Sequence, residues 1–271
     1  DPAWPNYEMQ TLLYGGRPVR YRLHPDLGFL PDPDEVLALI GPRTRALVLN
    51  SPSNPAGSVI DAARMEAIVR GAAERGVLVI SDEVYDEIVF DGHHVGARRF
   101  APETVVSVFS FSKTYSMTGW RVGYAVVPES FALVAERVQE TLLSCGSTLS
   151  QVAALAALEG PQDTIAANLE RYRRRRDAAV ARLAAAGIDV PVPGGAFYLM
   201  VPLAPGADSR QAALDLVEAG VSVAPGSAFG DVARDYVRLS LASADEVLDR
   251  GIDRLVAWRA GTGGGLATTR R

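Results

Sequence analysis

The most constraining feature of this sequence is a series of short apolar runs that alternate with longer helical segments. The runs are "RALVLN" (45–50), "VLVIS" (77–81), "VVSVFSF" (105–111) and "VGYAVV" (122–127). They are almost continuously apolar, as expected of strands covered on both faces. Between the first two runs, Asp61–Glu74 predicts a helix with Asp61 as its N-cap and Gly76 at its end. Strands that alternate with helices predict βαβ units and a mostly parallel sheet covered by helices.

The pattern changes after Gly160-Pro161. A long amphipathic segment that ends at Gly187 predicts a connecting helix. Two short strands, "AFYLMV" and "YVRLSLA", and two helices, near Ser209–Ala219 and Ala244–Ala260, then predict a smaller α/β unit. The expected organisation begins with a large domain at residues 1–163, incomplete at its N-terminus, and a connecting helix at residues 164–186. A small C-terminal domain at residues 187–260 and a flexible Gly/Thr-rich tail at residues 261–271 follow.

Composition excludes several classes of function. The net charge of −5 and the pI of about 5.3 leave no basic field for nucleic acid. No apolar run approaches the roughly 18 residues of a membrane span. Cys145 is the only cysteine, which excludes a disulfide framework and a thiolate cluster. The pair His93 and His94 lies in a polar turn, so we expect no metal site, and we interpret Arg173–Arg176 as a solvated helix face. A soluble, cytoplasmic protein is expected.

Polar side chains follow three successive predicted strands. Asn54 follows the first strand, Asp82 and Tyr85 follow the second, and Ser110, Ser112 and Lys113 follow the third, with Arg121 opening the fourth. Ligands of open parallel sheets bind outside the carboxyl ends of the strands, so these groups are expected along one edge.

The types of these groups favour one ligand. A desolvated lysine attacks a carbonyl, and serine hydroxyls with an arginine suit a phosphate. A carboxylate suits a protonated ring nitrogen, and a phenol with an amide suits a ring oxygen. Pyridoxal 5′-phosphate carries all four partners. Each residue could also have an ordinary structural role, such as Asp82 as a helix N-cap or Lys113 as a surface lysine. Such roles would then have to produce a complete set of cofactor ligands by chance, at every one of these strand ends.

Several longer motifs strengthen this interpretation. They are "NSPSNPAG", "SDEVYDEIVFDG", "SFSKTYSMTGWRVGYAV", "GGAFYLMV", "APGSAFG" and "VRLSLA". In order and separation they resemble the fold type I pyridoxal-phosphate aminotransferases of class I/II, in the aspartate aminotransferase superfamily. The resemblance spans nearly the whole chain.

The resemblance implies a role for each matching residue. Lys113 resembles the lysine that forms a Schiff base with the cofactor and moves the proton. Asp82 resembles the partner of the pyridine nitrogen, while Tyr85 and Asn54 resemble the pair that binds the ring's phenolic oxygen. Ser110, Ser112 and Arg121 resemble phosphate ligands, and Arg238 resembles the arginine that binds the substrate carboxylate. Trp4 resembles the aromatic residue that stacks on the pyridine ring, and Gly195 resembles the glycine that allows close approach of the substrate.

The implied activity is transfer of an amino group between an L-amino acid and a 2-oxo acid, in a homodimer. Alternatives are another reaction on the same cofactor (β-elimination, decarboxylation or oxidative deamination) or a non-enzymatic sensor module. Val138–Leu169 contains no arginine or lysine, which disfavours a dicarboxylate substrate, and "LLSCGSTLS" would tolerate an apolar or aromatic side chain. Members of the family normally begin earlier than this chain, so we expect a preceding segment that is unrecorded or disordered.

Overall fold

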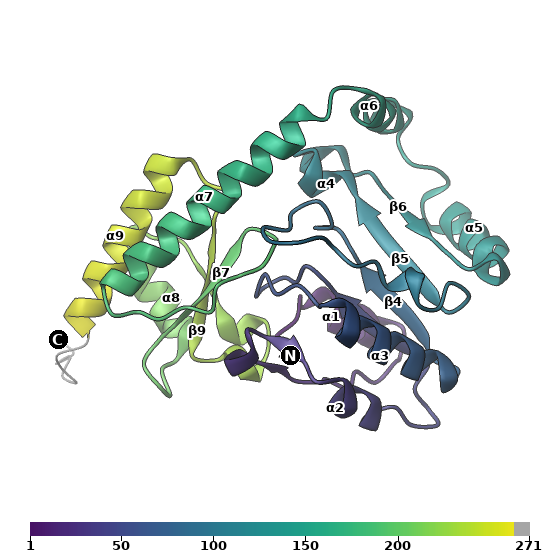
Figure 1. Cartoon of the computed structure of the whole chain (residues 1–271), viewed down its shortest axis with the longest axis horizontal. Helices are drawn as coiled ribbons and strands as arrows, with labels where there is room; N and C mark the ends of the chain where they lie inside the picture. Colours follow the sequence, from purple (N-terminus) through teal and green to yellow (C-terminus); the bar gives the residue numbers. More distant parts are fainter. Residues whose placement is uncertain (263–271) are drawn as a thin grey trace.

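The computed structural model describes residues 1–262 and is organised around two main β-sheets (Figure 1). The strands are β1 (Leu23–His24), β2 (Leu30–Pro31), β3 (Ala46–Asn50), β4 (Leu78–Asp82), β5 (Val105–Ser110), β6 (Gly123–Val126), β7 (Tyr198–Pro202), β8 (Ala224–Pro225) and β9 (Tyr236–Ser240). The α-helices are α1 (Asn6–Leu13), α2 (Pro33–Ala38), α3 (Ala62–Glu74), α4 (Phe111–Thr114), α5 (Glu129–Leu143), α6 (Thr148–Glu159), α7 (Asp163–Ala185), α8 (Ser209–Glu218) and α9 (Asp245–Thr262).

The first sheet has the strand order β3-β4-β5-β6. Strands β3, β4 and β5 are parallel, and β6 pairs with β5 in the antiparallel direction. Asn50 lies opposite Asp82, and Asp82 lies opposite Val108, so the carboxyl ends of these strands meet at one edge. The predicted mostly parallel α/β sheet is confirmed, with β6 as its antiparallel member.

Helix α3 covers this sheet through an apolar face. Met65, Ile68 and Val69 are fully buried and belong to the same core cluster as Leu49 of β3. Burying a side chain of this size contributes about 1.5–3 kcal/mol. The Asp61 carboxylate accepts a hydrogen bond from the main-chain N–H of Arg64, which confirms the predicted N-cap.

The second sheet is antiparallel, in the order β7-β9-β8, and packs against α7, α8 and α9 in the largest core cluster. Figure 1 shows α7 as a long helix that runs from α6, beside the first sheet, to α9, beside the second. Its bounds, Asp163–Ala185, match the predicted connecting helix. Helix α9 includes Gly261 and Thr262, which were predicted in the tail, and the rest of that predicted tail lies outside the described residues. The predicted domain boundaries stay a prediction.

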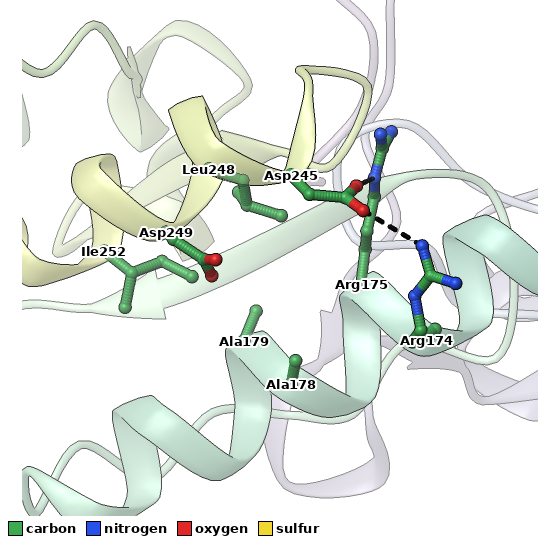
Figure 2. A pocket seen from close by; sticks show the side chains of 8 residues that line it. All are labelled: Arg174, Arg175, Ala178, Ala179, Asp245, Leu248, Asp249 and Ile252. Atoms are coloured by element: carbon green, nitrogen blue, oxygen red, sulfur yellow. Dashed lines mark hydrogen bonds and ion pairs between the residues drawn. The ribbon is translucent and has the colours of Figure 1, made fainter.

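Ion pairs join α7 to α9. Figure 2 shows Asp245 of α9 between Arg174 and Arg175 of α7, with side-chain N···O distances of 2.9 Å and 2.5 Å. Below this pair, small residues of α7 face α9 across a cavity of about 160 Å³, and these residues are Ala178 and Ala179. Two arginines of the basic run on α7 therefore contact α9, which is held to the protein mainly by its buried face.

The expectation that Arg173–Arg176 is a solvated face is wrong for Arg175, whose side chain is 12% exposed, and for Arg176, whose side chain is only 8% exposed. The Arg176 guanidinium lies 4.6 Å from the centroid of the Phe90 ring and donates a hydrogen bond to the carbonyl of Pro193. It also pairs with Asp91. Helical periodicity turns Arg176 toward the protein interior, whereas Arg174 stays exposed.

Replacing Arg176 with alanine should lower the free energy of unfolding by about 2–3 kcal/mol, because the buried carbonyl of Pro193 loses its donor and Phe90 loses packing. Urea unfolding followed by circular dichroism measures this. Arg174→Ala is the matched control, because the Arg174 side chain is 64% exposed and surface ion pairs contribute about 0–1 kcal/mol. Equal effects of the two substitutions would contradict the assignment.

The α5–α6 surface, formed by residues 129–159, exposes many large apolar side chains. They are Phe131, Leu133, Val134, Val138, Leu142, Leu143, Leu149, Val152, Leu155 and Leu158. Apolar patches of this kind usually mark interaction surfaces in soluble proteins.

Candidate active site

A cavity of about 520 Å³ opens beside the carboxyl end of β4. Side chains from the first sheet line one side of it, and α1 lines the other. Among the predicted site residues, Trp4 and Asp82 line this cavity together. Besides Asp82, the side chains from the sheet are Val48, Ile80 and Val108.

The Asp82 carboxylate faces this cavity and accepts two hydrogen bonds. The Tyr7 hydroxyl donates to Oδ2, and the main-chain N–H of Val84 donates to Oδ1 at 3.3 Å. Burial raises the pKa of Asp82, and these two hydrogen bonds oppose that rise. The β3 side chain Asn50 donates to the main-chain carbonyl of Asp82 at 3.1 Å, which holds the end of β4 in place.

Lys113 is the only lysine in the sequence, and it lies at the carboxyl end of the neighbouring strand. It is partly buried on the short helix α4, where its Nζ lies 5.9 Å from the Tyr85 ring centroid and 5.8 Å from that of Phe197. Burial lowers the pKa of Lys113, and the charges of Arg121 and Arg238 lower it further. A larger fraction of this amine is therefore unprotonated, which is the nucleophilic form.

Tyr85 is buried beneath this lysine. Its hydroxyl hydrogen-bonds the hydroxyl of Tyr198 at 2.9 Å, and its ring packs edge-on against Phe197. Burial is the main cause that raises the pKa of Tyr85, so the phenol stays protonated at neutral pH. Tyr85 and Asn54 have different hydrogen-bond partners in this structure, because the Asn54 side-chain oxygen accepts a hydrogen bond from Arg238. Their shared role toward a ring oxygen stays a prediction.

Arg238 enters the site from β9 of the second sheet. Its guanidinium carbon lies 4.3 Å from the centroid of the Tyr198 ring and 4.8 Å from that of Phe229. Its Nη1 donates to the Asn54 side-chain oxygen at 2.7 Å. Its Nε is buried and has no hydrogen-bond partner among the described residues. A partly buried arginine with a free donor is suited to a bound anion.

The three predicted phosphate ligands surround Lys113 in the chain. Ser110 caps α4 by accepting a hydrogen bond from the main-chain N–H of Ser112 at 3.1 Å, and Ser112 is buried. Arg121 is exposed, and it adopts a left-handed backbone conformation with φ of 52°. Its Nη1 donates to the carbonyl of Thr118 at 2.8 Å. Their role toward a phosphate stays a prediction.

Gly195 lies where the two sheets meet, in what we call the Gly57–Gly195 seam. The main-chain N–H of Gly195 donates to the carbonyl of Gly57 at 2.9 Å. A Cβ on Gly195 would lie 2.5 Å from the Ile88 carbonyl oxygen, and a Cβ on Gly57 would lie 2.7 Å from the Gly195 carbonyl oxygen. The structure gives Gly195 a packing reason to be glycine, and its predicted contact with substrate stays a prediction.

A buried acidic group lies directly after Asp82. Glu83 is 1% exposed, and its carboxylate contacts His94 Nε2 at 2.7 Å and accepts a hydrogen bond from the Ser107 hydroxyl at 2.8 Å. His94, which the sequence analysis did not favour as a metal ligand, thus pairs with a carboxylate. Within residues 1–262, no cluster of three or more metal-ligating side chains occurs, and no helix is long and apolar enough to cross a membrane.

Trp4 and Tyr85 were predicted from the sequence, but three other aromatic residues of the site were not, namely Tyr7, Tyr198 and Phe229. Tyr7 follows Trp4 by three residues and contacts Asp82, 75 positions away, so no local pattern reveals the pair. Tyr198 and Phe229 enclose Arg238, and Met200 lies directly opposite Arg238 across β7 and β9. The period of two along β7 places Tyr198 and Met200 on the same face, which is the signal that could have found Tyr198.

Known proteins resemble this chain over most of its length. Residues 1–255 match the family described as aminotransferase class I and II. The aspartate/prephenate aminotransferase of Thermus thermophilus is 38% identical over 260 residues, which cover 94% of this chain and 66% of that protein. The arginine–pyruvate transaminase of Pseudomonas aeruginosa is 37% identical over 260 residues, with the same two shares. The chain thus spans about two thirds of the length of these curated relatives.

Solved structures of aminotransferases also resemble this chain over most of its length. The aspartate aminotransferase of Thermus thermophilus with maleate has a TM-score of 0.90 and 38% identity, over 95% of this chain and 68% of that one. The aromatic aminotransferase of Pyrococcus horikoshii has a TM-score of 0.92 and 33% identity, over 97% of this chain and 72% of that one.

Proposed function

The chain belongs to the class I and II aminotransferase family, and we propose that it transfers an amino group between an L-amino acid and a 2-oxo acid with pyridoxal 5′-phosphate as cofactor. One observation carries the proposal. The only lysine of the chain is partly buried, has a lowered pKa and lies beside Tyr85, on the short helix that follows the strand next to the one ending in Asp82.

The residues present fit this cofactor. Lys113 offers a partly buried amine with a lowered pKa, and Asp82 offers a carboxylate that faces a cavity. Arg238 offers a buried donor without a partner among the described residues, which suits the carboxylate of an amino acid substrate. When bound, pyridoxal 5′-phosphate supplies an aldehyde that condenses with amines and a ring that accepts electrons from the α C–H bond. Ser110, Ser112 and Arg121 would hold its phosphate, and Trp4 would cover the ring.

The proposed reaction assigns a separate task to each protein group. Asp82 would pair with the ring nitrogen and favour its protonated form. The Lys113 amine would bind the cofactor's aldehyde carbon and would move the α-proton of the substrate. Arg238 would bind the substrate carboxylate and thereby orient the α C–H bond. The phenol of Tyr85, which burial keeps protonated, would donate to the ring oxygen together with Asn54.

The finer parts of the proposal concern substrate and assembly. The lack of basic residues in Val138–Leu169 supports an apolar or aromatic side chain over a dicarboxylate. The exposed α5–α6 surface supports a homodimer, in which that surface would be covered. A cytoplasmic location is part of the same proposal.

Half-reaction spectroscopy tests the proposed function. Purified protein is loaded with cofactor and mixed with single amino acids in the absence of any oxo acid. A transaminase converts the bound cofactor fully to its amine form, and a 2-oxo acid then restores the original spectrum. Release of ammonia or carbon dioxide without that reversible change would assign a different reaction. Cofactor binding without any spectral response would favour a sensor module.

Replacing Arg238 with lysine should lower kcat/KM about 100-fold, chiefly through KM, because lysine lacks the fork of donors and the stacking between two rings. Steady-state kinetics measure this, and the absorption of the bound cofactor should stay unchanged. Arg234→Lys is the control, because Arg234 is exposed and pairs only with the exposed Asp231. An unchanged KM in Arg238→Lys would remove the carboxylate assignment.

A further inference from the structure

Tyr7 is the group in the candidate site to which neither the sequence motifs nor the proposed reaction assign a task. It lies on α1, lines the same cavity as Asp82 and donates its hydroxyl proton to Asp82 Oδ2. Two contacts fix its position. The Trp4 ring packs edge-on against it with centroids 5.5 Å apart, and the Thr11 hydroxyl donates to its main-chain carbonyl at 2.7 Å.

We propose that Tyr7 is a positioning residue that keeps Asp82 in its carboxylate form, and so keeps the proton of the pair on the pyridine nitrogen of the bound cofactor. This inference rests on the proposed function. It adds a residue that acts through Asp82 and touches neither the substrate nor the reacting atoms.

The hydrogen bond between Tyr7 and Asp82 runs from the phenol to the carboxylate. Burial raises the pKa of Tyr7, and the charge of Asp82 raises it further. The phenol therefore stays protonated across the working pH range, and its hydroxyl acts as the donor toward Asp82. A hydrogen bond to an ionised group is stronger than a bond between neutral groups and favours the ionised form.

Opposing influences act on the protonation of Asp82. Burial and the neighbouring charge of Glu83 both favour the neutral acid. The hydrogen bonds from Tyr7 and from the Val84 main chain favour the carboxylate. The Tyr85 phenol, which follows on the same turn, is also near Asp82. Of the two donors, only Tyr7 is a side chain, so it is the one that substitution can remove.

The protonation of Asp82 would be coupled to that of the ring nitrogen. A ring nitrogen and a carboxyl group in contact titrate as a pair, and the shared proton stays on the nitrogen as long as the carboxylate is well stabilised. Without the Tyr7 hydroxyl, the carboxylate loses one of its two donors in a partly buried site. The proton then moves toward Asp82, and the ring becomes a weaker acceptor of electrons.

The test compares Tyr7→Phe with Tyr21→Phe in protein loaded with ¹⁵N-labelled pyridoxal 5′-phosphate. The Tyr21 hydroxyl donates to the Val48 carbonyl at 3.0 Å, so its removal deletes a nearby phenol without touching Asp82. In Tyr7→Phe, the ¹⁵N NMR signal of the ring nitrogen should move toward the unprotonated value. In Tyr21→Phe, it should stay at the wild-type value. In Tyr7→Phe, kcat should fall about tenfold with KM nearly unchanged.

The outcomes separate the two proposals. A Tyr7→Phe protein whose ring-nitrogen signal equals that of the wild type overturns the role of Tyr7 and leaves the proposed function intact. Equal shifts in both variants also overturn it, because a general disturbance of the site would then explain the change. A wild-type protein that binds no cofactor contradicts the proposed function itself. Thermal unfolding of each loaded variant checks that it is folded.

Discussion

Replacing Lys113 with alanine is expected to abolish turnover, with a loss of at least about 10⁴-fold, because the variant lacks both the covalent anchor and the base. The visible absorption of the bound cofactor should disappear with it. The sequence offers an unusually clean test, since Lys113 is its only lysine. Borohydride reduction of the loaded wild-type protein should fix the cofactor on a single peptide, identified by mass spectrometry.

The control for this prediction is Lys113→Arg. Arginine keeps a positive charge beside Tyr85 but does not condense with an aldehyde under these conditions, so this variant should also lack the reduced adduct. A cofactor adduct on any peptide without residue 113 would contradict the assignment. Persistence of the visible band in both variants would do the same.

Replacing Asp82 with alanine should leave the cofactor bound but reduce kcat about 10³-fold. Two opposite charges about 4 Å apart near a protein surface interact by about 4 kcal/mol, which corresponds to roughly three powers of ten in rate. Cofactor absorption and steady-state kinetics measure the two effects separately. Glu87→Gln is the matched control, because Glu87 is an exposed carboxylate on the same turn. Full activity in Asp82→Ala would contradict the proposed electron-accepting role of the ring.

Local sequence patterns predicted the helices and strands that a short window of sequence is enough to define. The apolar runs located β3, β4 and β5, and the aspartate at position 61 located the start of α3. The direction of β6 was not specified, because an apolar run has the same pattern whichever way the strand runs. Arg176 was misassigned because a run of like charges usually indicates solvent, whereas its helical phase turns it toward Phe90.

The candidate site was predictable for residues that lie at or directly after the carboxyl end of a strand. Asp82 and Lys113 follow adjacent parallel strands, so the rule about carboxyl ends was enough to place them on one edge. The partners of Arg238 were not predictable in this way. Asn54 is 184 positions from Arg238, and the ring of Phe229 comes from a separate turn. Such contacts depend on how the two sheets meet, which no short window of sequence encodes.

The Gly57–Gly195 seam bears on how accurately Arg238 is held opposite Lys113. Two backbones meet there without an intervening side chain, so the spacing across the site does not vary with rotamer changes. Binding sites tolerate displacements of only about 0.5 Å. A methyl group added at either glycine would push the two backbones apart by more than this tolerance. Substrate recognition therefore depends on the lack of a side chain at both positions as well as on the residues that bind.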